Sequence, residues 1–583
     1  MPVIEKLSVR ARLFALIFLA IGAVFVCRLF YLQVVAHADF VKLAAAEHDK
    51  KFDLPATRGL IYAKDGDHIV PLVLNEPVYT VYADPAEVKD AHRIANVIHR
   101  VAGGEMVTGF EERLQNKKRR YVVLAQQVNK RQADLIMKEK LSGVGTQAEQ
   151  KRVYPEGSLA AQVLGYVNRE GKGQYGLEGA LDNRLAGKDG LRTAVVDARG
   201  IPLTVSSKDD VITPPKNGDD IVLSVDRNIQ AYIEKALAEG LKNAKANHGS
   251  ALVLDPNTGR VMAMATLPTY DPSQYYKMTD YGVFQNPVVS DPYEAGSGIK
   301  TLTMVAGLDS GAVTPASVFT NVGYDTVDGI RIKNAEPGKY LGRTDMTGVI
   351  EHSLNSGVIY ILKQMGKGQV NYQARQQLYD YFTNRFGIGQ LTGIEQTNEQ
   401  AGKIFSPDDE QGNNVRYANM VFGQGFNITM LQSAMAFSAA INGGTMYKPT
   451  LIEGTMKPDG DIAPQAPAVK ATSIISAQAS AELRSMIQSA RMRVYAKADK
   501  PGYIIGGKSG TSQTIDPKTG KYRDENAIAT YTGFGGNGTP RYVVMVRIVD
   551  SQLPGFDGTI AAQPIFANIS NWLLDYLRIP KVQ

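Results

Sequence analysis

Cysteine is almost absent from this sequence, in which Cys27 is the only one among 583 residues. One cysteine cannot form a disulfide within the chain, and it cannot build a zinc site from four cysteines or from two cysteines and two histidines. Histidine is sparse as well, with seven residues, and no two of them have the HExxH spacing of a zinc peptidase. We therefore expect neither an intrachain disulfide nor a metal centre.

A dominant charge of one sign is also missing. Lysine and arginine (64) barely exceed aspartate and glutamate (58), and the net charge of +6 is too small to favour nucleic-acid binding. Hydrophobic residues make up 44% and charged residues 21%, which excludes a wholly disordered chain and a multi-span membrane protein. At roughly 150 residues per domain, the length predicts three or four domains.

The N-terminus contains one long hydrophobic run. Residues 1–12 are basic, and residues 13–35 are apolar except for Arg28. Crossing a bilayer takes about 20 residues, so residues 13–35 predict an uncleaved transmembrane anchor if Arg28 reaches toward the headgroups. The basic residues 1–12 then stay in the cytoplasm, and the bulk of the chain lies outside it. A cleaved signal peptide, with Ala36-His37-Ala38 as its cleavage site, is the alternative.

The region from 36 to 215 mixes short elements and carries no chemical constellation. Strands are expected near residues 61 and 78–82, and apolar residues at helical spacing predict a helix over 86–102. The basic run 117–120 is interpreted as a solvated loop before a strand, and the glycine-rich residues 154–187 as irregular. The whole region is interpreted as a binding or pedestal module.

After Pro214-Pro215 the pattern changes to that of one large α/β domain over 220–583. Asp226 is expected to cap a helix. Apolar runs at 250–255, 260–266 and 541–550 predict strands, and Trp572 lies in a predicted closing helix.

Ser297 and Lys300 form the only Ser-x-x-Lys in the chain. At the start of a helix this spacing brings an amine within reach of the hydroxyl. A serine needs a base to become a nucleophile, and a lysine can serve if burial or a neighbouring cation lowers its pKa. Alone, the pattern is weak, because a capping serine and a surface lysine would look the same.

Two further elements follow in the same domain. Ser353-Leu354-Asn355 offers a hydroxyl and an amide two residues apart. Lys508-Ser509-Gly510-Thr511 is interpreted as an edge strand beside a cleft, with glycine allowing a substrate backbone to approach. The order S-x-x-K, S-x-N, K-S-G is far more specific than any single piece, and it is the motif set of penicillin-binding proteins and class A β-lactamases.

Residues 502–509 also match the phosphate-loop pattern GxxxxGK[ST]. A phosphate loop must open a helix, whereas Ser509 is followed by GTSQTIDPKTG, which is typical of a strand and a turn. Nucleotide binding is therefore not expected.

Over nearly its full length the chain resembles the class B penicillin-binding proteins, the monofunctional peptidoglycan transpeptidases. Besides the three motifs, the resemblance rests on segments 58–61, 81–85 (VYADP), 152–183, 254–272 and 423–432 (GQGFNITMLQ). It implies an α/β (α+β) serine transpeptidase/β-lactamase-like catalytic domain, an elongated mixed α+β pedestal and one transmembrane helix. Segments 81–85 and 152–183 look most like the division-specific branch, with elongation and sporulation branches as alternatives.

The resemblance also implies roles in the acylation chemistry. Ser297 would attack the penultimate D-Ala carbonyl of a stem pentapeptide, Lys300 would take its proton, and Ser353 would relay protons with Lys508. The amine of a second stem peptide would then resolve the acyl-enzyme into a crosslink. No metal or cofactor enters this mechanism, and β-lactams would acylate Ser297.

Substrate binding is implied for the remaining motif residues. Asn355 would orient the donor backbone, and Ser509 and Thr511, with Gly510 between them, would hold the donor carboxylate. The amides of Ser297 and Thr511 would form the oxyanion hole.

One departure from the family pattern keeps alternatives open. The residue two before the nucleophile is usually proline, and here it is Ala295. This departure supports a division scaffold with little turnover as an alternative. A D,D-carboxypeptidase or β-lactamase on the same fold is considered as a further alternative. By resemblance, the partners are a SEDS-type glycosyltransferase and other divisome proteins of the inner membrane.

Overall fold

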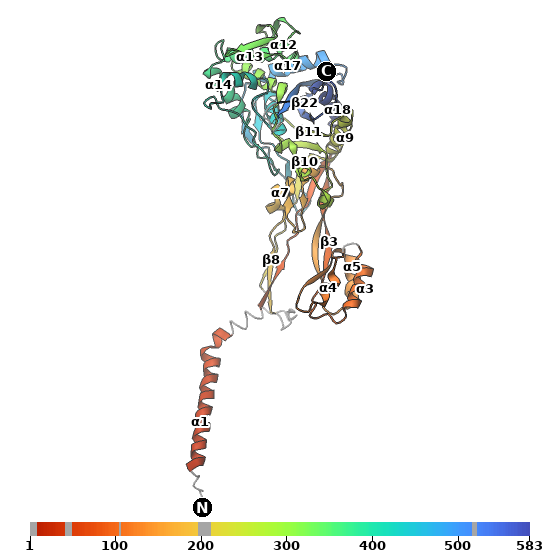
Figure 1. The fold of residues 1–583 in the computed structure, drawn as a ribbon, viewed down its shortest axis with the longest axis vertical. Coiled ribbons are helices and arrows are strands. Elements are labelled where there is room, and N and C mark those ends of the chain that lie inside the picture. Colours follow the sequence, from red (N-terminus) through yellow and green to blue (C-terminus); the bar gives the residue numbers. More distant parts are fainter. Residues whose placement is uncertain (1–8, 41–48, 104–105, 196–210, 516–521, 583) are drawn as a thin grey trace, which may run out of the picture. The chain divides into compact units, whose positions relative to one another are not determined.

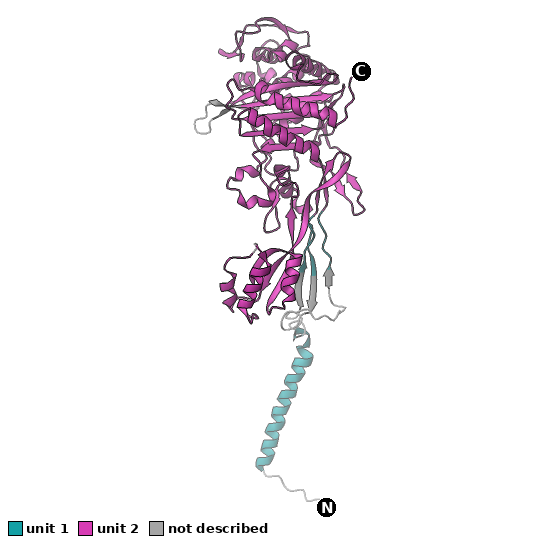
Figure 2. Cartoon of the chain, turned by 90° about the vertical axis from the view of Figure 1, so that its right-hand side faces the viewer, with its two compact units in different colours: residues 1–58, 186–218 teal, residues 59–185, 219–583 magenta. Residues whose placement is uncertain are grey.

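The computed structural model describes residues 9–40, 49–103, 106–195, 211–515 and 522–582 (Figure 1). It divides into two compact units, which Figure 2 colours separately: residues 1–58 with 186–218, and residues 59–185 with 219–583. The predicted division into a pedestal (36–215) and a catalytic domain (220–583) stays a prediction.

The first unit contains a long apolar helix. α1 covers Val9–Phe30 and continues into a short π-helical segment, η1 (Tyr31–Val35), and neither has a buried residue. Together they form a 27-residue helix that is long and apolar enough to cross a membrane. The predicted span 13–35 lies within this helix.

The same unit contains a three-stranded antiparallel sheet. In it, β8 (Gly190–Val195) pairs with β1 (Asp49–Leu54) on one side and with β9 (Val211–Thr213) on the other. The Gly218 amide also donates to the Thr57 carbonyl (2.9 Å). Segments that are far apart in the sequence therefore meet in this unit.

The second unit begins with a seven-stranded sheet in the order β19-β18-β10-β2-β3-β4, with β5 also paired to β3. The first part of the 16-residue β3 pairs with β2, and its later part lies between β4 and β5. The strands are β2 (Ile61–Asp65), β3 (His68–Ala83), β4 (Val122–Asn129), β5 (Val144–Val153), β10 (Ile221–Asp226), β18 (Ile452–Met456) and β19 (Ile462–Pro464).

Three helices pack on the later part of β3, β4 and β5, and we call this assembly, residues 78–149, the small lobe. The helix predicted over 86–102 begins only at Ala91, because Asp90 caps it by accepting a hydrogen bond from the Arg93 amide (2.9 Å). The basic run 117–120 is an exposed loop before β4, as predicted. The helices are α3 (Ala91–Val101), α4 (Phe110–Gln115) and α5 (Lys130–Lys138).

The stretch predicted to be irregular, 154–187, consists of short elements instead. A buried ion pair between Arg152 and Glu178 (2.7 Å) joins the end of β5 to this stretch. The elements are α6 (Ala161–Leu164), β6 (Tyr166–Val167), β7 (Gly173–Gln174), α7 (Gly176–Ala180) and α8 (Asp182–Leu185).

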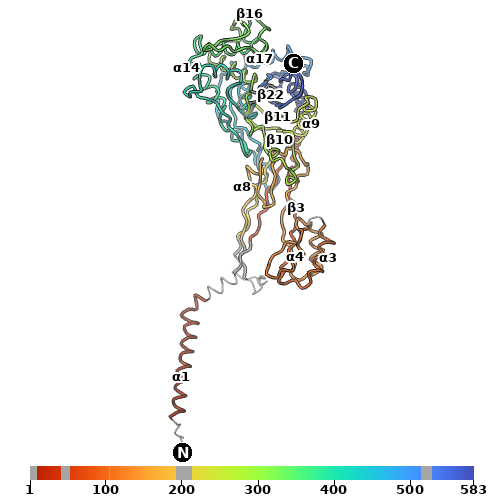
Figure 3. The backbone as a smooth tube through the Cα atoms, viewed as in Figure 1, coloured from red at the N-terminus to blue at the C-terminus, as the bar shows by residue number. Residues whose placement is uncertain are grey.

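The centre of residues 219–583 is a five-stranded antiparallel sheet in the order β12-β11-β23-β22-β21. Figure 3 labels β11 and β22 of this sheet, which come from distant parts of the chain. The strands predicted from apolar runs are confirmed, and β21 is an edge strand. Their bounds are β11 (His248–Leu254), β12 (Val261–Leu267), β21 (Ile504–Ile515), β22 (Tyr522–Gly536) and β23 (Pro540–Val549).

Both faces of this sheet are covered, which explains the unbroken apolar runs of its strands. Successive side chains of a strand point to opposite faces, and Leu252 accordingly belongs to one core while Val253 belongs to the other. α9 (Arg227–Asn243), capped by Asp226 as predicted, and the closing helix α18 (Gln563–Tyr576) cover the Val253 face.

The other face of the sheet packs against a large helical core. Its main helices are α11 (Lys300–Asp309), α12 (Met346–Glu351), α13 (Asn355–Met365), α14 (Tyr372–Tyr379), α15 (Asn414–Met420), α16 (Met430–Ile441) and α17 (Ala477–Tyr495). Two hairpin-like pairs lie beside α13, formed by β13 (Val318–Asn321), β14 (Tyr324–Val327), β15 (Ile330–Lys333) and β16 (Gly342–Asp345). The remaining short elements are η3 (Pro272–Lys277), η4 (Tyr281–Phe284), α10 (Pro287–Ser290), η5 (Gly296–Ile299), η6 (Asp380–Arg385), β17 (Met446–Tyr447), β20 (Val469–Ala471) and η7 (Gly558–Ala562).

Candidate active site

Ser297 lies in a tight 3-10 turn, η5, that leads directly into α11. The preceding Gly296 has φ +57°, and a Cβ there would lie 2.2 Å from the Thr511 carbonyl oxygen, so only glycine fits. Its amide donates to the Gly423 carbonyl (3.0 Å). The Ser297 side chain is partly exposed and has no hydrogen-bond partner among the described residues. The serine hydroxyl is therefore held at the surface on a firmly positioned turn.

Lys300 begins α11 and is fully buried. Its Nζ donates to the Ser353 carbonyl oxygen (2.5 Å) and to Ser353 Oγ (3.1 Å). Burial, together with the charge of Lys508, lowers the Lys300 pKa well below its usual value. A neutral lysine amine, which can accept a proton, is thereby favoured.

Ser353 connects α12 to α13 and has a left-handed backbone, with φ +53°. A non-glycine residue in this region costs energy and often marks a functional position. Asn355 opens α13, and its Nδ2 donates to the Lys333 carbonyl in β15 (2.9 Å). Ser353 thus contacts Lys300 directly, whereas the Asn355 amide nitrogen is engaged by the β14–β15 hairpin.

The third motif lies on the edge strand β21. Lys508 is buried, and burial lowers its pKa to about 8, a shift that the carboxylate of Asp557 partly opposes. Its Nζ donates to the Ser509 carbonyl (3.1 Å). A Cβ at Gly510 would lie 2.8 Å from the Ala295 carbonyl and 3.1 Å from the Gly298 amide nitrogen. The strand therefore runs directly against the turn that carries Ser297.

The hydroxyl of Thr511 has a defined orientation. Thr511 is exposed, and its Oγ1 accepts a hydrogen bond from the Gly558 amide (3.1 Å). Because the oxygen is used as an acceptor, the hydroxyl proton is free to be donated to an anionic group in front of the strand.

Lys508 and Ser509 lie inside a strand, and no helix starts after them. The phosphate-loop interpretation, which requires a helix at this point, is therefore rejected. Within the described ranges, no group of three or more His, Cys, Asp or Glu side chains is arranged to hold a metal ion.

A buried amide network behind Ser353 and Asn355 was missed by the sequence analysis. Ser356 donates from its backbone to Asn334 Oδ1 (2.9 Å) and from its hydroxyl to Asn321 Oδ1 (3.0 Å). Asn334 in turn donates to Asn321 (3.0 Å), and all three residues are buried. Neither asparagine belongs to a sequence motif, so only the folded packing reveals them.

Ser297, Lys300, Ser353 and Lys508 thus belong to one cluster beside β21. A surface hydroxyl lies one turn before a buried amine of lowered pKa, and backbone amides of a turn and an edge strand adjoin it. This arrangement is suited to acyl transfer through a serine ester, with the lysine as base.

Two family models match the chain. Residues 249–571 match the penicillin binding protein transpeptidase domain, and residues 53–223 match the penicillin-binding protein dimerisation domain.

Curated proteins match nearly the full length. The chain is 30% identical to penicillin-binding protein PbpB of Mycobacterium tuberculosis, covering 95% of this chain and 83% of that protein. It is 30% identical to stage V sporulation protein D of Bacillus subtilis (97% and 86% covered). It is 29% identical to peptidoglycan D,D-transpeptidase FtsI of Escherichia coli (95% and 89% covered).

Solved structures match as well. The crystal structure of penicillin binding protein 3 from Mycobacterium tuberculosis in complex with aztreonam has a TM-score of 0.68 at 26% identity, covering 91% of this chain and 98% of that one.

Proposed function

The chain belongs to the class B penicillin-binding protein transpeptidases, and on this premise we propose that it crosslinks peptidoglycan through an acyl-enzyme on Ser297. The observation that carries the proposal is the position of Lys300. This lysine lies one turn after Ser297, is fully buried, and donates from its amine to Ser353 Oγ. A buried lysine without a carboxylate partner is costly to the fold, and such residues concentrate at active sites.

In the first half-reaction, Ser297 Oγ attacks the carbonyl of the penultimate D-Ala while the neutral amine of Lys300 takes the hydroxyl proton. The bond to the terminal D-Ala then breaks, and the leaving amine receives a proton through Ser353 and Lys508. In the second half-reaction, the amine of another stem peptide attacks the ester and loses a proton, and Ser297 regains its own. No net proton or electron is consumed.

Binding groups surround this path. The amides of Ser297 and Thr511 are proposed to stabilise the oxyanion. Ser509 and Thr511 would hold the donor carboxylate, and the free proton of Thr511 supports this role because Gly558 occupies its acceptor site. Gly510 lets the strand lie close to the turn, and this close approach supports the proposed oxyanion hole. Asn355 would orient the donor backbone through its amide oxygen.

Ala295 does not argue for an inactive scaffold. Its φ of −69° is the value that a proline would impose, so the turn keeps its shape without one. The scaffold alternative is therefore not favoured, and the similarity to peptidoglycan D,D-transpeptidases disfavours the carboxypeptidase and β-lactamase alternatives.

The N-terminal helix is proposed to anchor the chain in the inner membrane, with residues 1–12 in the cytoplasm. We propose a septal role, which the similarity to FtsI supports, with a SEDS-type glycosyltransferase and other divisome proteins as partners. β-Lactams are expected to acylate Ser297, and the solved relative with aztreonam supports this expectation.

Labelling with a fluorescent penicillin tests the proposal. We expect the wild-type chain and Ser273→Ala, an exposed control serine, to be labelled, and Ser297→Ala to remain unlabelled. The mass of the active-site peptide would then show the adduct on residue 297. A folded Ser297→Ala chain that is still acylated would refute the assignment of the nucleophile.

A further inference from the structure

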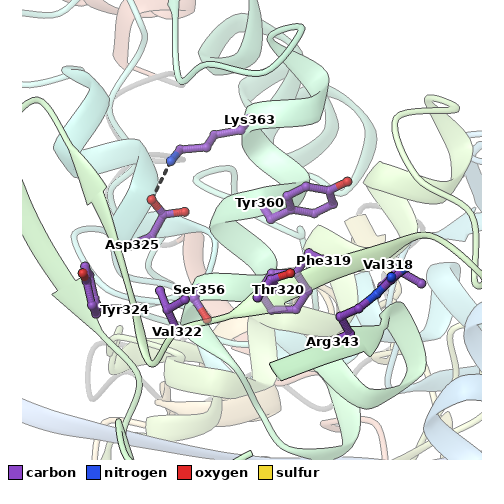
Figure 4. A pocket seen from close by; sticks show the side chains of 10 residues that line it. All are labelled: Val318, Phe319, Thr320, Val322, Tyr324, Asp325, Arg343, Ser356, Tyr360 and Lys363. Carbon is purple, nitrogen blue, oxygen red and sulfur yellow. Dashed lines mark hydrogen bonds and ion pairs between the residues drawn. The ribbon is translucent and has the colours of Figure 1, made fainter. Parts of the chain in front are cut away.

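A pocket lies beside the Ser353-Leu354-Asn355 motif and shares its neighbour Ser356. Helix α13 and strands β13, β14 and β16 line a pocket of about 520 Å³, within the usual range for ligand sites (Figure 4). We propose that this pocket binds a carboxylate-bearing stem peptide of uncrosslinked peptidoglycan, separate from the donor in front of Ser297. The proposal rests on the proposed function, which names the polymer, and it adds a place for a second strand.

The two sides of the pocket differ in charge. On one side, Lys363 Nζ pairs with Asp325 Oδ1 (2.5 Å), so these two charges balance. On the other side lies Arg343, which is exposed and whose guanidinium has no partner in the part of the chain that the structure describes. Figure 4 shows Tyr360 and Phe319 between these charged groups.

These groups select the chemistry of the ligand. An unpaired guanidinium binds a carboxylate through two parallel hydrogen bonds. Phe319 and Tyr360 are stacked, with ring centroids 5.5 Å apart, and they offer an apolar wall to a peptide or sugar. An elongated ligand with a carboxylate at the Arg343 end therefore fits better than a small ion.

The pocket is lined by a residue that directly follows the catalytic motif, which is why we choose the polymer as its ligand. Ser356, one of the lining residues, directly follows Asn355. A transpeptidase must hold two strands near one serine, and this pocket lies beside the same helix terminus that carries the motif.

The same contacts provide a route for coupling. Tyr324 lines the pocket and pairs across the hairpin with Lys333, whose carbonyl accepts the Asn355 amide. The Ser356 hydroxyl belongs to the buried amide network with Asn321 and Asn334. A ligand that displaces β14 would therefore move Asn355, and binding at the two sites would be reciprocally coupled.

The test uses the full chain in detergent with Ser297 already acylated by penicillin, so that the donor site is blocked. Binding of soluble N-acetylglucosaminyl-N-acetylmuramyl pentapeptide is measured by calorimetry. We expect the acylated wild type to bind, Arg343→Ala to bind about ten-fold more weakly, and Arg541→Ala, an exposed control on β23, to bind like the wild type.

A second measurement keeps the proposal independent of the variant. A probe with amidated carboxylates should bind the wild type more weakly than the normal probe does. For Arg343→Ala, which lacks the guanidinium, amidation of the probe should cause no further loss of affinity. Equal binding of the normal probe by wild type and Arg343→Ala, or no binding to the acylated wild type, would overturn the pocket proposal. Failure of penicillin to acylate the wild type would instead overturn the proposed function.

Discussion

In the small lobe, charged side chains lie at the surface, where Arg100 pairs with Glu139 (2.6 Å) and both remain partly exposed. The lobe core is an apolar cluster of residues such as Ile98 and Leu124. Around the active site, by contrast, the lysines at positions 300 and 508 are buried. A buried cation costs free energy unless it is paired. The comparison teaches that the lobe is built for stability, whereas the catalytic region accepts a loss of stability to obtain lysines of lowered pKa.

The largest expected effect comes from Lys300→Met, which keeps the volume and removes the amine. The rate constant of penicillin acylation should fall about 1,000-fold, because general bases contribute factors of this order. The midpoint of thermal unfolding should not fall, since the amine that is removed is fully buried and has no carboxylate partner. Stopped-flow acylation and calorimetry measure the two quantities.

Lys118→Met in the exposed loop of the small lobe is the matched control for this change, and we expect it to alter neither quantity. Near-wild-type acylation by Lys300→Met would mean that another group acts as the base.

The second-largest effect is expected in the small lobe, where a core substitution should lower stability and leave acylation unchanged. Ile98 is completely buried in the lobe core, and Ile98→Ala should lower the unfolding free energy by about 2–5 kcal/mol. The acylation rate constant of the folded fraction should stay unchanged. Leu135→Ala, at a 43% exposed position of the same lobe, should cost far less. A slower acylation rate constant in Ile98→Ala would break the separation between the two regions.

The third effect concerns pH. The acylation rate should rise as Lys300 loses its proton, at a pH well below 10.5, and fall above about pH 8 as Lys508 loses its own. The two apparent values belong to the coupled pair. A pH–rate profile that rises without a fall up to pH 10 would contradict a protonated Lys508 in the relay.

The unfolding free energy should also depend on pH, because the pKa of Lys508 differs between the folded and unfolded chain. In the folded chain the pKa of Lys508 is lowered to about 8, so protonation favours the unfolded state and the full cost is present below that pH. Between about pH 8 and 10.5, the unfolding free energy of the wild type should rise by about 3 kcal/mol relative to Lys508→Met. Denaturant titrations at several pH values measure the difference.

The smallest effect is expected for Asp557→Asn. Asp557 raises the pKa of Lys508, so its neutralisation should move the alkaline limb of the pH–rate profile toward lower pH. Asparagine can still cap η7, and the rate at pH 8 should fall by only about two-fold. The exposed Asp550→Asn is the control. An unchanged alkaline limb in Asp557→Asn would remove this carboxylate from the control of Lys508.

Much of the fold was predictable because its signals are local. Asp226 at the start of α9 and the apolar strands β11 and β12 follow from neighbouring residues. The prediction places the start of α3 five residues too early, because apolar spacing does not show that the helix begins after the N-cap Asp90. Short elements such as α7 escaped prediction, since their stability comes from packing.

The amino-acid sequence alone determined the order of the three motifs, the apolar N-terminal segment and the edge strand at Lys508, because each depends on residues close together in the chain. Tertiary structure decided that Lys300 meets Ser353 across 53 residues, that Asn355 reaches the Lys333 carbonyl and that an unpaired arginine faces a pocket. Burial and charge at a point in space are sums over distant segments, so a lysine acquires its lowered pKa only when the chain has folded around it.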